Sequence, residues 1–410
     1  MAKKKVRKLK KRVKVLFVIC ILILGLSVYF FTSNFYFSKY KEDKAVVKTE
    51  EKTKYPQEYS FDLFMVGDAL IHSSVYEDAH LDSGKYDFKP MLKYIKPISS
   101  QYDLAYYNQE TILGGADLGY SNYPCFNSPD AVGDAFIDAG FNLVSLATNH
   151  TMDKGERGVL HSVDYWSSKK NIVWDGQRSS WEERNKERIY EKNGIKYAFF
   201  SYTTWTNGLE TPSGKEYLNN VYSPEKAKAD IDKIRDKVDL IIVAMHWGTE
   251  YSFDISTEQK EIANYLSSLG VQLIIGSHPH VVEPVEYINN GKTFVIYSLG
   301  NFISDQAGIE RLIGLSMEVV VKKIVEEDTT TLKIENPKAE LIYTKSNYGG
   351  KRNFRVYPYS KLNDSILSNY STYYNEYKNI VSSRYLELVW GLSRSWLNGK
   401  IYIIFNKWKF

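Results

Sequence analysis

The fold is decided by residues 238–280, which read VDLIIVAMHWGTEYSFDISTEQKEIANYLSSLGVQLIIGSHPH. Two apolar runs, VDLIIVAM and VQLII, flank a helix-like pattern at 257–270. Short apolar runs that alternate with helical patterns of about 10 to 15 residues are typical of buried strands joined by helices. The stretch therefore predicts a strand–helix–strand unit and an α/β protein.

The same alternation of strand-like runs and helix-like patterns extends toward the N-terminus. Strand-like runs occur at 61–68, 103–110, 141–150 and 171–176, and helix-like patterns occur at 89–98, 129–140, 156–169 and 223–237. After Val281 the sequence turns to strand-like runs, with Asn289-Asn290-Gly291 as a turn signal between the first two. These later runs predict a second, more antiparallel sheet packed on the first.

Charge is distributed unevenly along the 410 residues. The first 14 residues contain nine of the 53 basic side chains and no acid, which leaves 44 basic against 49 acidic side chains in the remainder. A body with this negative balance is poorly suited to phosphate contacts, so we expect no nucleic-acid partner. Of the two cysteines, only Cys125 lies in the body, which excludes a disulfide there.

Residues 15–31, VLFVICILILGLSVYFF, carry no charge and are just long enough to cross a membrane. The cations before them predict a single-pass protein of the cell membrane, with a cytoplasmic N-terminus and an extracellular body. A cleaved signal peptide is the alternative, although no A-x-A pattern follows Phe31. We expect a cytoplasmic basic segment (1–14), a transmembrane anchor (15–32), a polar linker (33–59), a main domain (60–345) and an aromatic-rich C-terminal extension (346–410).

Polar and metal-binding residue types follow the strand-like runs. Histidines stand there at His150, His246, His278 and His280, and they are joined by Asp68, Asn108, Glu110 and Asn149. Ligands of open α/β sheets bind at the carboxyl ends of the strands, so these residues are expected to share one crevice. Imidazole, carboxylate and amide donors without a thiolate favour divalent Mn, Zn or Fe over a structural zinc site.

The motifs GDALIH, NQE, ATNHTMDKG, HWGTEY, GSHPHVVEPVE and YSLGNF occur in this order between about residues 60 and 310. In order and spacing they resemble the CapA family of poly-γ-glutamate capsule synthesis proteins, also called PgsA, which is related to calcineurin-like metallophosphatases. The resemblance implies a four-layer fold of two β-sheets flanked by helices, with a site for two metal ions on the loops at the strand ends.

The resemblance also implies roles for single residues. The implied metal ligands are Asp68, Glu110, Asn149, His246, His278 and His280, and His150 would contact the leaving oxygen. Two departures count against phosphatase activity: Leu70 stands where an Asp-x-His motif would place its histidine, with His72 the nearest one, and the second motif lacks Gly-Asp.

Several neighbouring residues have two interpretations. Asp153 either holds the His150 imidazole or caps the next helix, and Glu250 is either a general acid or base or a surface carboxylate. Asn108 and Asn301 are candidate substrate contacts. One carboxylate of the pair Glu283 and Glu286 either faces the site or lies away from it. His72 is either a further metal ligand or an ordinary side chain.

The resemblance implies a protein that acts in poly-γ-glutamate or related capsule formation, with an anionic polymer, the membrane and other capsule-synthesis membrane subunits as partners. Two divalent ions would serve hydrolysis or transfer. A non-catalytic scaffold subunit of a capsule synthase complex and a general metal-dependent surface phosphoesterase stay open as alternatives.

Overall fold

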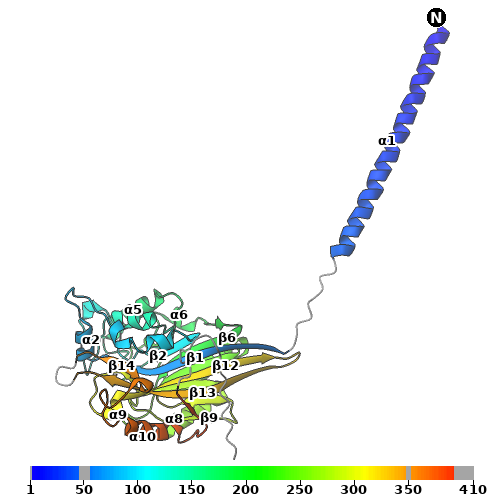
Figure 1. Ribbon diagram of the computed structural model, residues 1–410. Helices are drawn as coiled ribbons and strands as arrows, with labels where there is room; N and C mark the ends of the chain where they lie inside the picture. Colours follow the sequence, from blue (N-terminus) through cyan, green and yellow to red (C-terminus); the bar gives the residue numbers. More distant parts are fainter. Residues whose placement is uncertain (1, 46–55, 348–351, 392–410) are drawn as a thin grey trace, which may run out of the picture. The chain divides into compact units, whose positions relative to one another are not determined.

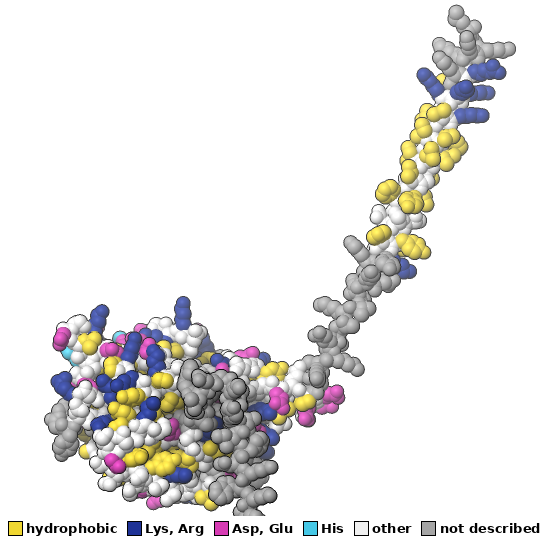
Figure 2. Space-filling model, in the orientation of Figure 1, with side chains coloured by type: hydrophobic (Ala, Val, Ile, Leu, Met, Phe, Trp, Pro, Cys, Tyr) yellow, Lys and Arg dark blue, Asp and Glu magenta, His cyan; other side chains and the backbone are white. Residues whose placement is uncertain are grey.

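A computed structural model describes residues 2–45, 56–347 and 352–391 (Figure 1). The chain divides into two units, Met1–Tyr55 and Pro56–Phe410. The first unit contains helix α1 (Ala2–Ala45), in which Leu9–Lys39 is long and apolar enough to cross a membrane, with a mean hydropathy of 2.7. Its apolar side chains form one band, with Lys and Arg side chains on the N-terminal side of that band (Figure 2).

The second unit is built around two β-sheets. The larger sheet has the order β14-β13-β12-β1-β2-β3-β4, with β11 paired to β1 and β15 paired to β13. Its strands are β1 (Gln57–Ala69), β2 (Leu104–Asn108), β3 (Leu143–Ser145), β4 (Val173–Asp175), β11 (Asn301–Ile303), β12 (Ile313–Val325), β13 (Thr330–Lys345), β14 (Arg355–Pro358) and β15 (Val389–Trp390).

The smaller sheet has the order β5-β6-β7-β8-β10-β9. Its strands are β5 (Tyr190–Lys192), β6 (Ile195–Thr203), β7 (Leu240–His246), β8 (Leu273–Ser277), β9 (Val285–Ile288) and β10 (Thr293–Ile296). Strands β6, β7, β8 and β10 run parallel, and every residue of β7 and β8 is buried. Burial on both faces explains why their sequences are continuous apolar runs rather than alternating ones.

Helices surround the two sheets, and several of them cover the outer faces. They are α2 (Ser73–Ala79), α3 (Lys96–Ser99), α4 (Ala131–Asp138), α5 (Gly155–Ser167), α6 (Trp181–Asn185), α7 (Pro224–Ile234), α8 (Thr257–Ser268), α9 (Ile309–Leu312) and α10 (Tyr370–Ser382). Helices α2 and α4 pack with one face of β1 and β2, and helices α7 and α8 pack on the smaller sheet. The start of α8 is fixed by a capping box between Ser256 and Gln259.

The largest apolar core lies between the two sheets. It joins Phe61, Leu63 and Met65 of β1 to Ile242 of β7 and Ile275 of β8, all at most 1% exposed. Because α2 and α4 lie outside one sheet and α7 and α8 outside the other, the unit has four layers, as the family resemblance implies.

The expectation that the strands after Val281 form a second, more antiparallel sheet of their own is wrong. Both sheets are mixed, and the later strands are split between them: β9 and β10 join β8, whereas β12, β13 and β14 extend the sheet of β1. The run TFVIYSLGNF crosses from one sheet to the other at Gly300, so its two halves become β10 and β11. Sequence periodicity identifies a strand but carries no information about its pairing partner.

The C-terminal extension is described up to residue 391. Helix α10 contributes Tyr377 and Val381 to the core between the sheets, and Leu388, just before β15, joins them there. Trp390 lies within the described part, and Trp396, Trp408 and the apolar run at 401–405 lie outside it.

Candidate metal centre

The polar residues that follow the strands meet at one edge of the two sheets. Asp68 of β1 lies beside Asn108 of β2 and Asn301 of β11, and His246 at the end of β7 lies beside Ser277 of β8. All five side chains are buried. Because the carboxyl ends of parallel neighbours share an edge, residues far apart in the sequence come together here.

Glu110, His278 and His280 form the centre of this cluster. One candidate ligand atom from each lies within 4.8 Å of the other two. The Oε1 atom of Glu110 is 3.6 Å from Nε2 of His280 and 3.8 Å from Nε2 of His246. Within the described part of the chain, neither carboxylate oxygen of Glu110 nor Nδ1 of His278 has a hydrogen-bond partner. Buried carboxylate oxygens and ring nitrogens without hydrogen-bond partners are suited to bind a divalent metal ion.

Burial and mutual proximity set the charges of the cluster. Burial raises the pKa of Glu110 well above its usual value, an effect that His280 partly opposes. Burial also disfavours the charged form of His280, but Glu110 and Asp68 outweigh it and raise the His280 pKa to about 9. Burial, reinforced by the other imidazoles, lowers the pKa of His278 to about 3 and that of His246 well below 6.5. These two rings are therefore neutral, the form in which histidine binds metal.

His246 is held by polar side chains on both ring nitrogens. Its Nε2 atom is 2.9 Å from Oδ1 of Asn149, and its Nδ1 atom is 3.1 Å from Oγ of Ser277 and 3.4 Å from Nδ2 of Asn108. Asn149 in turn donates to Oδ1 of Asn207 at 3.3 Å. The Asn149 amide oxygen and the His246 ring thus face each other across the cluster.

His150 has a separate support. Its Nδ1 atom is 2.7 Å from Oδ2 of Asp153, and the same carboxylate oxygen accepts a hydrogen bond from the backbone N–H of Phe126 at 2.6 Å. Helix α5 begins at Gly155 with Lys154 as its N-cap residue. Asp153 therefore holds the imidazole of His150 and does not cap the helix.

Both amides expected to contact substrate are bonded within the protein. Asn108 donates to Oδ1 of Asp68 at 2.9 Å and accepts from Oγ of Ser145 at 2.6 Å. The Oδ1 atom of Asn301 is 3.0 Å from Nδ1 of His280, and its Nδ2 donates to two oxygens of the following segment at 2.8 and 2.9 Å. In this structure the two amides orient residues of the cluster.

A cleft of about 340 Å³ leads from the surface to the cluster. Its walls are formed by Thr204, Trp205, Gly248, Thr249, Glu250, Glu258 and His278. Of these, His278 belongs to the central group, and Glu250 lies on the wall beside it. Trp205 is 57% exposed, which gives the cleft one apolar surface at its rim.

Three candidates lie outside the central group. His72 packs edge-on against the ring of Phe126, with 5.3 Å between the ring centres. Glu283 accepts a hydrogen bond from Nε2 of Gln259 at 2.7 Å, and Glu286 accepts one from a tyrosine hydroxyl at 2.8 Å. These contacts assign the two carboxylates to the packing of the smaller sheet.

The sequence pattern places Ser277 at a strand end without a role, and it gives no indication of Ser145, Asn207, Phe126 or Trp205. The two serines belong to buried strands, where a short hydroxyl does not disturb the apolar pattern. Asn207 has a positive φ of 53° and precedes a glycine, so its Asn-Gly pair signals a turn. Nothing in that signal indicates a contact with Asn149.

A sequence model described as "Bacterial capsule synthesis protein PGA_cap" matches residues 62–306. The PGA biosynthesis protein CapA of Bacillus subtilis (strain 168) is 33% identical over 177 residues, 41% of this chain and 44% of that protein. The capsule biosynthesis protein CapA of Bacillus anthracis is 26% identical over 265 residues, 62% of each chain. The chain thus spans less than two thirds of the length of these curated relatives.

Among solved structures, the calcineurin-like phosphoesterase YfkN from Bacillus subtilis aligns with a TM-score of 0.44 and 14% identity. The alignment covers 78% of this chain and 99% of that chain. Similarity at this level carries no inference about activity.

Proposed function

Because the chain belongs to the bacterial capsule synthesis protein family PGA_cap, we propose that it acts in the synthesis or export of an anionic capsule polymer, poly-γ-glutamate or a related chain. The names of its two relatives, which refer to PGA and capsule biosynthesis, support this proposal. One structural observation carries the proposed mechanism. The buried carboxylate of Glu110 has no hydrogen-bond partner among the described residues and lies close to histidine rings.

The proposed metal ligands are the six residues named from the sequence: Asp68, Glu110, Asn149, His246, His278 and His280. We propose two divalent ions, Mn, Zn or Fe, because carboxylate, amide and imidazole donors suit these metals. When bound, such ions lower the pKa of water and polarise a carbonyl or phosphoryl oxygen, which is the chemistry of hydrolysis or transfer.

The residues beside the cluster would handle protons. Because the Asp153 carboxylate accepts at Nδ1 of His150, that nitrogen carries the hydrogen and Nε2 remains to exchange a proton with a leaving group. Glu250 is the second proposed acid or base, since it lines the cleft next to His278. Asp153 itself acts by fixing the orientation and tautomer of His150.

We further propose that helix α1 anchors the chain in the cell membrane as a single span, with the N-terminus in the cytoplasm and the body outside. The apolar stretch within Leu9–Lys39 and the nine cations in the first 14 residues support this orientation. An anchored body would work beside other membrane subunits of capsule synthesis, where the polymer emerges.

The test measures two quantities for one substitution, Glu110→Gln. Capsule polymer is quantified per cell in the strain that carries this chain, and bound metal is quantified by mass spectrometry on the purified full chain. The matched control is Glu261→Gln, which removes an exposed carboxylate from α8. We expect Glu110→Gln to lose both metal and polymer while the control retains both.

The alternatives give different results in the same experiment. A scaffold subunit would keep polymer production after the metal is lost. A general phosphoesterase would hydrolyse small phosphoesters in vitro and leave polymer levels unchanged when Glu110 is replaced. A wild-type chain that binds no divalent metal would refute the metal-dependent part of the proposal.

A further inference from the structure

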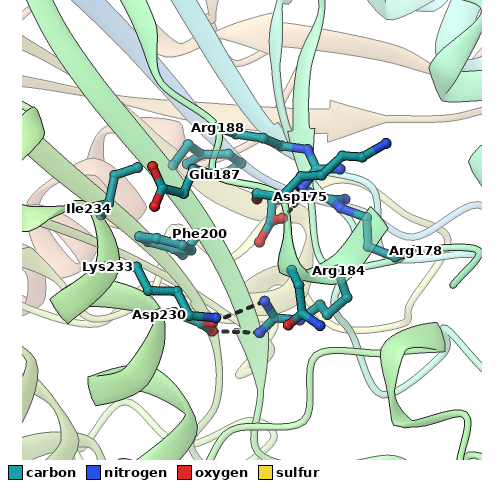
Figure 3. A pocket seen from close by; sticks show the side chains of 12 residues that line it. Asp175, Arg178, Arg184, Glu187, Arg188, Phe200, Asp230, Lys233 and Ile234 are labelled. Atoms are coloured by element: carbon teal, nitrogen blue, oxygen red, sulfur yellow. Dashed lines mark hydrogen bonds and ion pairs between the residues drawn. The ribbon is translucent and has the colours of Figure 1, made fainter. Parts of the chain in front are cut away.

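A second pocket lies away from the metal cluster, between β4, β6, α6 and α7 (Figure 3). It is lined by Asp175, Arg178, Arg184, Asn185, Lys186, Glu187, Arg188, Phe199, Phe200, Asp230, Lys233 and Ile234. None of these residues belongs to the cluster around Glu110. The cavity measures about 30 Å³, and one water-sized group needs about 10–15 Å³, so the space suits a small polar group.

Two of the cations in this pocket are held rigidly. Arg184 makes a two-point contact with Asp230, with its Nη1 atom 3.0 Å and its Nη2 atom 2.5 Å from the two carboxylate oxygens. Arg178 is 3% exposed, pairs with Asp175 and lies with its guanidinium over the ring of Trp174. Guanidinium groups fixed in this way keep their direction without further loss of side-chain freedom.

The pocket carries more positive than negative charge. Five of its lining residues are basic and three are acidic. One of the acids, Glu187, is already bonded to Lys237 outside the pocket at 2.7 Å. Lys186 pairs with Glu182 and Glu183, and Arg188 pairs with the same carboxylate of Glu183. Lys233 is exposed on α7 and makes no ion pair within the described ranges.

The basic groups also act on each other. Burial lowers the pKa of Arg178, and the positive charges of Arg188 and Arg184 lower it further. The neighbouring Asp175 carboxylate acts in the opposite direction. The Nε atom of Arg178 is buried and has no hydrogen-bond partner in the described part of the chain. Figure 3 shows the side chains of Arg178 and Arg188 beside Asp175, whereas the guanidinium of Arg184 points toward Asp230. An anion there would offset the repulsion between these guanidinium groups.

We propose that this pocket binds an oxyanion, a carboxylate or phosphate group, between Arg178, Arg188 and Lys233. Guanidinium groups match the planar, two-oxygen geometry of a carboxylate and also bind phosphate. If the bound group is a carboxylate of the anionic polymer, part of that polymer lies in this pocket. The identification of the polymer as the origin of the carboxylate rests on the proposed function. The binding of an oxyanion as such does not.

The test uses phenylglyoxal, a reagent that modifies arginine, on the full chain in detergent. Mass spectrometry gives the rate of modification at each arginine, and a bound probe should protect Arg188. A short γ-linked glutamyl oligomer and inorganic phosphate are the two probes. Arg157, which is exposed on α5 and outside this pocket, serves as the internal reference. Because the modification rate is measured at Arg188 itself, binding of either probe at the basic N-terminal segment does not affect it.

We expect a saturating probe to slow modification of Arg188 at least about fivefold and to leave Arg157 unchanged. Lys233→Gln should raise the probe concentration needed for half protection by about tenfold, the effect of losing one charged contact. Lys170→Gln, an exposed lysine after α5, should not. Protection by the oligomer alone would assign the site to the polymer, and protection by phosphate alone would assign it to a free phosphate-type anion.

No protection of Arg188 by either probe would overturn the proposal, as would equal protection in the wild type and in Lys233→Gln. The experiment is repeated with Glu110→Gln to separate it from the proposed function. Protection that persists in this variant places the oxyanion in the second pocket even if the metal site has no role. Protection that disappears would mean that the probe binds at the metal cluster, which contradicts the proposal.

Discussion

Replacing Glu110 by glutamine should stabilise the body when metal is absent, and this gain should disappear or reverse when metal is bound. The carboxylate is fully buried, and its nearest cationic group is the His280 ring, 3.6 Å away. Without metal, removing a buried acid that lacks hydrogen bonds should stabilise the body by about 1–3 kcal/mol, the usual desolvation cost of such a group. With metal, the same change removes a central ligand.

The metal response can be estimated from the affinity change. Loss of a central ligand should weaken binding at least about 100-fold, which corresponds to about 2.7 kcal/mol at equal free metal. The advantage of Glu110→Gln measured in EDTA should therefore shrink to near zero or reverse when Mn²⁺ or Zn²⁺ is added in excess.

The assay is urea denaturation of the full chain in detergent, followed by fluorescence of the buried Trp166 and Trp247. Glu261→Gln, which removes an exposed charge from α8, should shift neither curve. The reasoning is refuted if the difference between wild type and Glu110→Gln is the same in EDTA and in metal.

Three further predictions concern groups around the cluster. Burial raises the pKa of Glu283 to about 8, partly opposed by its hydrogen bond from Gln259, so the folded state holds a proton that the unfolded chain loses near pH 4. The free energy of unfolding should therefore fall as pH rises from about 4 to 8. Relative to wild type, Glu283→Gln should increase this free energy only a little at pH 5 but by on the order of 3–5 kcal/mol at pH 8. Equal increases in urea denaturation at both pH values would contradict this. Asp153→Asn should reduce polymer per cell at least about tenfold with an unchanged circular dichroism spectrum, because the His150 tautomer is no longer fixed. A normal polymer level in Asp153→Asn beside a low level in His150→Ala would count against that role. Gly276→Ala would place a Cβ 1.8 Å from a backbone oxygen, so its urea midpoint should drop by an amount equivalent to about 3 kcal/mol or more, and an unchanged midpoint would contradict the packing described.

The sequence predicts the convergence of the cluster better than its internal contacts. Asp68, His246 and His278 follow buried runs, and the rule that ligands gather at the carboxyl ends of strands brings them together. The contacts that hold them depend on side-chain direction in the folded chain. Asn301 illustrates the difference, because a loop position suggested a substrate contact whereas its amide oxygen lies 3.0 Å from His280.

The fold shows the same division between local and long-range information. The helices and strands around residues 238–280 follow from apolar patterns and from the capping residues Ser256 and Gln259. The assignment of strands to sheets does not, since β12 pairs with β1 across more than 240 positions of sequence. Such pairing is decided by which apolar faces meet in the core, information that no short window contains.

The proposed ligands come from the strands of both sheets and the loops that follow them. Asp68, Glu110 and Asn149 lie at or after β1, β2 and β3 of the larger sheet, and His246, His278 and His280 lie at or after β7 and β8 of the smaller sheet. Neither sheet alone offers a complete coordination set. A chain that crosses a membrane unfolded could therefore acquire its metal only after the sandwich closes on the far side. The identity of the metal would then reflect the supply of ions in the compartment where folding is completed, and not only the preference of the ligands.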